Sequence, residues 1–554
     1  MNFKTIATFV ILLISIQTNA QISDAQQLKI DSLFVEWNQP NHPGGAIGIM
    51  KDGKTVFSKS YGLASLEYLV PNSTETIFNT GSVSKQFTAM GIVRLHEQGK
   101  LSVDDDIRKH LPELPDFGEV ITIRHMLHHT SGLRSLHAML ELAGWRGDDS
   151  RTNEDLNRFL LKQRDLNFKP GEENLYCNTG YMLMVNIIEK VTEEKFRDWM
   201  KKSIFEPLGM IHTYVEDNYS RIVPNNATSY YNSNPMQRAV EYWGYVGSGN
   251  AHSTTNDLLK WLANFHSPQS NWETSFKLLQ TLDPLNNGSE NNYAFGVVID
   301  QYGGAKRIQH GGAIGGFRAY VCSYPDQQLN IAVLTNFSAG SPGQKASQIS
   351  EILLEKTKIE TSKKVNNTHK PITLSKDQLN KFEASYWNDK DTYARKIYLK
   401  NDTLRYARSA SNESFLSPIG QNEFQMMGVG ADVIVKFELA KNGEKTMIVL
   451  IDSDPPIISK AFTPSVASTA EMKSYTGTFY SPELETTYTV FMKDEKLKWH
   501  HARHGDYDIK ILKADILEGD WPFNIIKYKR DKNGTITGIL VSNGRVKNCW
   551  FEKQ

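Results

Sequence analysis

The chain has 554 residues, which is too long for one hydrophobic core and predicts about two to four domains. Its 62 Lys and Arg residues balance its 62 Asp and Glu residues. This balance argues against nucleic-acid partners and anionic membrane surfaces, because both attract proteins with an excess of positive charge. The hydrophobic content of 40% is that of an ordinary globular protein.

Residues 1–20 have the pattern of a secretory signal peptide. Lys4 precedes an apolar run at residues 6–16, and small residues before Gln21 resemble a cleavage site. The run is shorter than the roughly twenty apolar residues of a spanning helix, and no later stretch is apolar enough to span. A buried first helix is the alternative. We expect cleavage after Ala20 and a periplasmic or secreted protein.

The next three hundred residues or so alternate between strand and helix patterns. Two runs of alternating polarity meet at Asp52-Gly53 and predict a β-hairpin. Helical patterns follow at residues 82–98, 181–192 and 253–265, and strand patterns return at residues 305–337. Strands at both ends with helices between them indicate an antiparallel sheet closed by distant segments, with a helical insertion.

The last two hundred residues contain an internal repeat. Residues 356–370 are polar and aperiodic, as in a linker. Beyond them, "FEASYW" at 382–387 corresponds to "YTGTFY" at 475–480, 93 positions later, and "KNG" recurs after 91 positions. Coincidence between generic strands is the alternative. A constant register favours two copies of an all-β unit of about ninety residues, enough for a small closed barrel.

Ser82 and Lys85 are the first candidates for chemistry. They stand three apart at the start of a predicted helix, so both side chains project from one face. The helix N-terminus favours a developing negative charge, and a partly desolvated lysine can accept the serine proton. A serine that merely caps the helix is the alternative.

Two further stretches could complete a hydrolytic site. Tyr176 and Asn178 lie two apart before a helix, where a phenol could donate a proton and an amide could face the same cavity. Taken alone, a tyrosine at this position is more often an aromatic packed at the start of the helix. His310 is followed by two glycines, Gly311 and Gly312, which would allow the backbone to approach a ligand closely. The N–H of Ala313 could then be an oxyanion donor. Taken alone, His310 is more often structural.

Together these stretches resemble the motifs of the penicillin-recognising serine hydrolases: class C β-lactamases, penicillin-binding proteins, and related D-aminopeptidases and esterases. The motifs S-x-x-K, Y-x-N and K/H-x-G correspond to Ser82–Lys85, Tyr176–Asn178 and His310–Gly312. Residues 122–133 also resemble the family, and the resemblance covers roughly residues 25–355. It implies an α+β fold, with an antiparallel sheet flanked by helices and a helical subdomain.

The two repeats extend the resemblance to bacterial D-aminopeptidases, which carry two lipocalin-like antiparallel β-barrels after the hydrolase domain. That architecture implies a loop from the last barrel that narrows the active site. The expected domains are a signal peptide (1–20), a β-lactamase-like domain (21–355), a linker (356–370) and two barrels (371–463 and 464–554).

The resemblance also implies roles. Ser82 would be acylated, Lys85 and Tyr176 would share the proton transfers, and Asn178 would position the substrate amide. Backbone N–H groups of Ser82 and Ala313 would form the oxyanion hole. No cofactor is expected, the substrate is a small molecule, peptide or ester, and the oligomeric state stays open.

His310 departs from the lysine that β-lactamases and carboxypeptidases usually have at this position. Imidazole is largely neutral at pH 7, so carboxylate binding should weaken. This favours a D-stereospecific aminopeptidase or an esterase. The alternatives are a D-alanyl-D-alanine carboxypeptidase or β-lactamase, and a non-catalytic sensor or binding protein.

The remaining histidines and cysteines carry no predicted chemistry. The pairs and clusters in "HHTSGL" and "WHHARH" lack a carboxylate at metalloprotease spacing, so no metal site is expected (His128, His129, His500, His501 and His504). Cys177, Cys322 and Cys549 form neither a disulfide framework nor a zinc pattern. Cys177 is expected to point away from the cavity and to pack.

Overall fold

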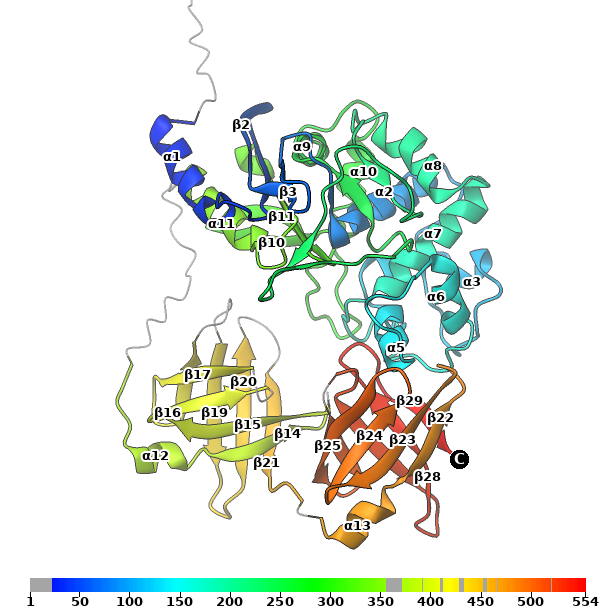
Figure 1. Cartoon of the computed structure of the whole chain (residues 1–554), viewed down its shortest axis with the longest axis vertical. Helices are drawn as coiled ribbons and strands as arrows, with labels where there is room; N and C mark the ends of the chain where they lie inside the picture. Colours follow the sequence, from blue (N-terminus) through cyan, green and yellow to red (C-terminus); the bar gives the residue numbers. More distant parts are fainter. Residues whose placement is uncertain are drawn as a thin grey trace, which may run out of the picture.

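The computed structural model describes residues 22–354, 371–390, 392–408, 412–427, 433–451, 456–465, 467–519 and 521–554. The predicted signal peptide and the predicted linker at 356–370 lie outside these residues. The described part contains the predicted fold: an antiparallel sheet with helices, a helical subdomain and two closed antiparallel barrels. Figure 1 shows the first domain above the two barrels.

A six-stranded antiparallel sheet forms the centre of the first domain, in the order β10-β11-β12-β13-β1-β2. The strands are β10 (Val298–Tyr302), β11 (Ala305–Ile314), β12 (Phe317–Tyr324), β13 (Leu329–Thr335), β1 (Gly45–Lys51) and β2 (Lys54–Tyr61). The predicted hairpin is confirmed as β1 and β2. Because β1 pairs with β13 from Gly45↔Thr335 to Lys51↔Leu329, segments far apart in the sequence close the sheet, as predicted.

Helices cover both faces of this sheet, so β13 is buried along its whole length, and most of its residues are apolar. Ile331 and Val333 pack in one core with α1 (Asp24–Ser32) and α11 (Pro342–Leu353). Alternate residues, including Leu334, pack in the other core with α9 (Thr255–Ala263). Figure 1 shows α1 beside α11 at one side of the sheet and α9 at the other.

The helical subdomain is built around α2 (Ser84–Glu97) and α7 (Asn178–Thr192), which pack against each other. Helix α2 is buried at nearly every position from Ser84 to Leu95, including polar residues such as Lys85 and Gln86. It ends at Gly99, whose φ of +68° allows the left-handed turn that the sequence predicts. The smaller helices complete the subdomain: α3 (Ile107–His110), α4 (Ile123–Leu127), α5 (Leu136–Leu142), α6 (Asn153–Leu160), α8 (Phe196–Met200) and α10 (Glu273–Leu278).

The two barrels repeat one plan. The first has strands β14 (Ala384–Asn388), β15 (Tyr393–Lys400), β16 (Thr403–Ala407), β17 (Glu413–Pro418), β18 (Glu423–Met426), β19 (Val433–Leu439), β20 (Lys445–Ile451) and β21 (Ile457–Phe462). The second has β22 (Gly477–Ser481), β23 (Thr486–Lys493), β24 (Lys496–His501), β25 (Gly505–Lys513), β26 (Ile516–Gly519), β27 (Ile525–Arg530), β28 (Ile536–Ser542) and β29 (Cys549–Lys553). A short helix precedes each barrel, α12 (Lys376–Asn380) and α13 (Thr469–Ser474). The 93-residue offset holds for the helix and the first strands, which confirms the predicted repeat.

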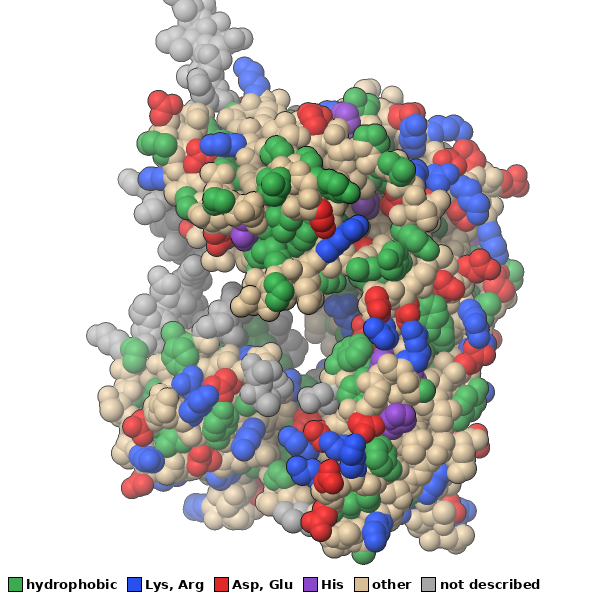
Figure 2. All heavy atoms as spheres, viewed as in Figure 1, with side chains coloured by type: hydrophobic (Ala, Val, Ile, Leu, Met, Phe, Trp, Pro, Cys, Tyr) green, Lys and Arg blue, Asp and Glu red, His purple; other side chains and the backbone are tan. Residues whose placement is uncertain are grey.

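The second barrel docks on the helical subdomain, beneath α5 in Figure 1. The Arg134 guanidinium contacts both carboxylate oxygens of Glu483, at 2.5 and 2.6 Å, and both side chains are almost fully buried. The Tyr488 hydroxyl donates to the carbonyl of Leu142 at 2.9 Å. Apolar residues of this barrel and of the subdomain belong to one core, whereas the first barrel has its own. Figure 2 shows positive and negative side chains mixed over this face of the molecule.

Candidate active site

Ser82 lies in a 3₁₀ turn (η2, Gly81–Val83) rather than in the first turn of the α-helix, which begins at Ser84. The turn is separate because Gly81 has a φ of +52° and its N–H donates to the Asn79 side chain at 3.0 Å. The Ser84 hydroxyl then donates to the carbonyl of Gly81 at 2.6 Å. This turn holds Ser82 next to the N-terminus of α2 and leaves Ser82 partly exposed.

Lys85 is fully buried, and its ammonium nitrogen lies 3.2 Å from the Ser82 hydroxyl. The same nitrogen donates to the carbonyl of Ser248 at 2.7 Å. Burial, and then the charge of Arg545, hold the pKa of Lys85 well below its usual value. The predicted proximity of Ser82 and Lys85 is therefore present, in an environment that favours the neutral amine.

Tyr176 joins this pair from the segment before α7. Its ring centre lies 4.8 Å from the Lys85 nitrogen. Its hydroxyl is buried and makes no hydrogen bond of normal geometry with another described residue. Burial raises the pKa of Tyr176, while the neighbouring Ser82 hydroxyl and Arg545 charge oppose this rise. The phenol therefore keeps its proton at neutral pH.

The far end of β11 brings the third motif to Ser82. Strand β10 pairs with β11 only as far as Gln309, so the following residues have one open edge, which contacts η2. A methyl group placed on Gly312 would lie 2.0 Å from the carbonyl oxygen of Thr80 and 3.2 Å from the backbone nitrogen of Ser82. A methyl group on Gly81 would lie 2.7 Å from the backbone nitrogen of Ala313. Glycines thus let the backbone nitrogens of Ser82 and Ala313 approach each other.

His310 is buried at this end of β11. Its Nδ1 lies 2.6 Å from the carbonyl of Gly311, which can only accept, so Nδ1 carries the proton. Its Nε2 then accepts from the Tyr293 hydroxyl at 2.9 Å. Burial, and then the nearby Lys85, lower the pKa of His310 to about 3. The imidazole is thus a neutral member of a hydrogen-bonded pair with Tyr293.

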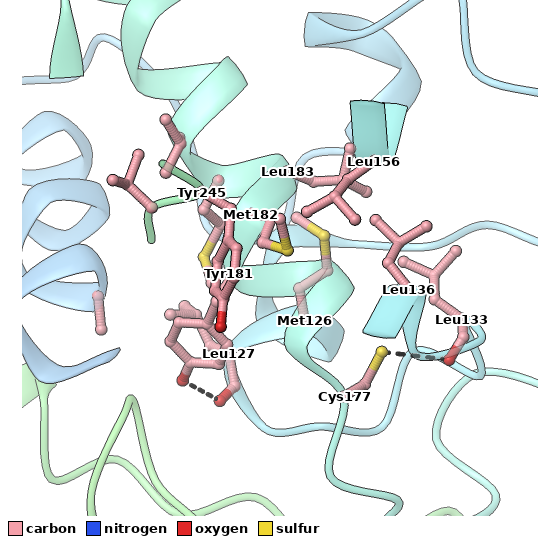
Figure 3. Close-up of a cluster of buried hydrophobic side chains, with 14 of the residues drawn as sticks. Met126, Leu127, Leu133, Leu136, Leu156, Cys177, Tyr181, Met182, Leu183 and Tyr245 are labelled. Carbon is pink, nitrogen blue, oxygen red and sulfur yellow. Dashed lines mark hydrogen bonds between the residues drawn. The ribbon is translucent and has the colours of Figure 1, made fainter. Parts of the chain in front are cut away.

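Asn178 is the first residue of α7, and its side-chain oxygen is buried without a hydrogen-bond partner among the described residues. Cys177, between Asn178 and Tyr176, points the other way. Figure 3 shows its sulfur in a cluster of apolar side chains, donating to the carbonyl of Leu133 at 3.3 Å. The prediction that Cys177 packs away from the cavity is confirmed.

A loop of the second barrel, residues 543–548 between β28 and β29, reaches this site. The Arg545 guanidinium lies 5.1 Å from the centre of the Tyr176 ring. A loop from the last barrel was expected near the active site, but the sequence did not show which residues form it. Nothing in the local sequence marks residues 543–548, because their proximity to Tyr176 depends on how the second barrel docks.

Tyr293, which contacts His310, and Ser248, which contacts Lys85, were not predicted from the sequence. Tyr293 carries no motif. Ser248 has a signal, since the glycines around it indicate a close backbone approach, and Gly247 indeed packs against the carbonyl of Tyr181 with a φ of +96°.

The histidines considered for metal binding have other contacts. His128 lies 3.0 Å from Asp283, and His129 accepts the N–H of Cys177 at 3.1 Å. His501 contacts the Thr486 hydroxyl at 2.8 Å. Over the described residues, no group of three or more His, Cys, Asp or Glu could hold a metal ion. No helix in the same residues is long and apolar enough to cross a membrane.

A separate cavity of about 830 Å³ lies between the two barrels. Its lining includes Arg395, Met472, Lys496 and Trp521, and none of the groups gathered around Ser82. At Ser82, by contrast, an alcohol, an amine with a lowered pKa and a protonated phenol come together.

Comparisons with known proteins show the family of this chain. A family model described as Beta-lactamase matches residues 27–353. Penicillin-binding protein 4* of Bacillus subtilis (strain 168) is 26% identical over 449 residues, covering 76% of this chain and 96% of that protein. The D-aminopeptidase of Gluconobacter oxydans (strain 621H) is 25% identical over 296 residues, covering 53% of this chain and 56% of that enzyme. The match thus spans about half of the D-aminopeptidase.

Solved structures support the fold. The octameric penicillin-binding protein homologue from Pyrococcus abyssi has a TM-score of 0.53 at 23% identity, covering 87% of this chain and 99% of that chain. The D-amino acid amidase from Ochrobactrum anthropi SV3 has a TM-score of 0.51 at 21% identity, covering 59% and 98%. Since the family model matches more than half of the residues, this chain belongs to the Beta-lactamase family.

Proposed function

We propose that this protein is a serine hydrolase of the S-x-x-K type that cleaves a small amide, peptide or ester through an acyl-enzyme on Ser82. The single observation that carries the proposal is the 3.2 Å contact between the Ser82 hydroxyl and the buried amine of Lys85, whose pKa is lowered. A neutral amine within hydrogen-bond reach of an alcohol is the arrangement that activates such a nucleophile.

The pKa of Lys85 is lowered and that of Tyr176 is raised, so Lys85 is suited to accept a proton and Tyr176 to donate one. Neutral Lys85 takes the Ser82 proton as the oxygen attacks the carbonyl carbon of the substrate. The backbone N–H groups of Ser82 and Ala313 receive the negative charge that develops on the carbonyl oxygen.

Tyr176 donates its proton to the leaving nitrogen or oxygen as the bond to the acyl carbon breaks. The resulting phenolate regains a proton from the Lys85 ammonium, whose nitrogen lies 4.8 Å from the Tyr176 ring centre. Water then hydrolyses the acyl-enzyme with Lys85 as base. The unpaired side-chain oxygen of Asn178 accepts an N–H from the substrate amide, which removes the cost of leaving that oxygen unsatisfied.

Several substrate classes remain within this proposal. Neutral His310 in place of a cation favours a D-stereospecific aminopeptidase or an esterase. A carboxypeptidase or β-lactamase is the alternative, and a non-catalytic sensor with this fold is a second one. The proposed leader at residues 1–20 would export the protein to the periplasm or the medium.

Ser82→Ala tests the proposal. The variant should lose hydrolysis of a D-alanyl anilide, a short-chain ester and nitrocefin by at least about a thousandfold, since the proposed nucleophile is removed. Circular dichroism should show an unchanged fold, and Ser474→Ala, an exposed serine near the second barrel, should keep wild-type rates. Retained activity in Ser82→Ala would reject Ser82 as the nucleophile.

A further inference from the structure

The loop at residues 543–548 is attached to the first domain through its backbone. The Ser135 N–H and the Asn167 side-chain nitrogen donate to the carbonyl of Arg545, at 3.2 and 3.1 Å. The Asn167 side-chain oxygen accepts the N–H of Lys547 at 2.7 Å. Since the backbone atoms make these contacts, the loop keeps its place whatever side chain residue 545 carries.

The Arg134 guanidinium fixes the next turn of the same loop. It donates to the carbonyls of Lys547 and Asn548, at 3.0 and 3.3 Å, while it pairs with Glu483. The loop is thus bound to the same buried ion pair that docks the second barrel, so docking and loop position are linked.

The side chain of Arg545 has no such anchor. Arg545 is an exposed residue, its guanidinium lies 5.1 Å from the Tyr176 ring centre, and it makes no ion pair or hydrogen bond with the described carboxylates. The other cation of this loop, Lys547, is paired with Glu173 at 2.8 Å. Arg545 therefore carries an unpaired positive charge at the mouth of the site.

The other ionisable groups around Tyr176 leave this charge uncompensated. Burial lowers the pKa values of His129 and His310, so both imidazoles are neutral. Burial also favours the neutral form of Lys85. A substrate anion near Tyr176 would find Arg545 as its partner, and a guanidinium is well suited to a carboxylate.

We propose that Arg545 binds a carboxylate on the leaving group of the substrate, and so supplies the cation that His310 does not. The inference rests on the proposed function, in which Tyr176 protonates the leaving group, because Arg545 lies over that same ring. In a released amino acid the carboxylate carbon is two bonds from the nitrogen that receives the proton. The substrate class is a short peptide whose last residue, with a free carboxylate, is the leaving group.

Matched substrates test this charge. D-alanyl-D-alanine and D-alanyl-D-alaninamide share an acyl group and differ by one negative charge on the leaving group. We expect wild-type kcat/KM to favour the acid by about tenfold at low ionic strength. Arg545→Gln should remove the preference, and Arg545→Glu should reverse it. Arg503→Gln removes a cation of the same barrel that is already paired with Asp149, and should keep the preference.

The results separate two explanations. Loss of the acid preference in Arg545→Gln with reversal in Arg545→Glu supports carboxylate binding. An equal loss of kcat/KM on both substrates in Arg545→Gln, or no acid preference in the wild type, overturns carboxylate binding. The Arg545 charge would then act only by lowering the pKa of Lys85.

Binding to Ser82→Ala distinguishes failure of this inference from failure of the proposed function. In that background the acid should bind more tightly than the amide by calorimetry, and Arg545→Gln should abolish the difference. A preference for the acid without wild-type turnover would reject the hydrolase and keep the carboxylate site. Turnover without any acid preference in either experiment would reject the site alone.

Discussion

Replacing Arg134 with methionine would leave the Glu483 carboxylate buried without a counter-ion between the helical subdomain and the second barrel. The Arg134 and Glu483 side chains are 1% and 3% exposed, so water cannot replace the missing partner. Breaking such a pair from one side costs about 3–5 kcal/mol. The carbonyls of Lys547 and Asn548 would each lose a charge-assisted hydrogen bond as well.

The double variant Arg134→Met/Glu483→Leu should cost far less than either single variant. Burial raises the pKa of the Glu483 carboxyl in spite of Arg134, which indicates that desolvation offsets much of the attraction within the pair. Removing both charges removes that desolvation cost, and apolar side chains of similar volume can occupy the space.

Urea unfolding of the full chain, followed by tryptophan fluorescence, measures these costs as a double-mutant cycle. The control is Arg503→Met, which breaks a partly exposed pair with Asp149 and should cost below about 1 kcal/mol. Labelling of Ser82 by a fluorophosphonate in the same samples reports whether the site keeps its shape. A single-variant cost as small as that of Arg503→Met, or a double variant as costly as the sum of the singles, would refute the reasoning.

Three further predictions concern the site. The kcat/KM should rise with pH as Lys85 loses its proton. Arg545→Gln should move this rise to higher pH, because removing a nearby positive charge raises the pKa of Lys85. A shift to lower pH at low salt would contradict this. Gly312→Ala should slow fluorophosphonate labelling at least about a hundredfold, since the methyl group would collide with the carbonyl of Thr80 and displace the Ala313 N–H. Labelling at the wild-type rate would show that this N–H is not needed. His310→Lys should improve kcat/KM for carboxylate substrates relative to neutral ones, and no improvement would mean that pocket shape, not charge, sets the preference.

Local patterns in the sequence predicted much of the fold. The hairpin at Asp52-Gly53 follows from a turn dipeptide and two alternating runs, and the 93-residue repeat follows from aromatic positions that recur in register. The start of α2 was placed two residues early. The local sequence does not show that Gly81 adopts a left-handed conformation, which places Ser82 in a separate 3₁₀ turn before the helix.

The site was predicted only as far as its motifs extend. Ser82, Lys85 and Tyr176 were found because their residue types and spacing carry chemistry. Arg545 and Tyr293 were not, because Arg545 reaches the site through the docking of the second barrel and Tyr293 through the packing of the segment before β10. No spacing in a single sequence encodes these contacts.

Peptide mapping of the mature chain after fluorophosphonate treatment tests the central claim most directly. The adduct should lie on the peptide that contains Ser82, and labelling should fall at least about a hundredfold in Lys85→Met, because the alcohol then lacks its base. An adduct on another residue, no adduct at all, or undiminished labelling without Lys85 would contradict the account.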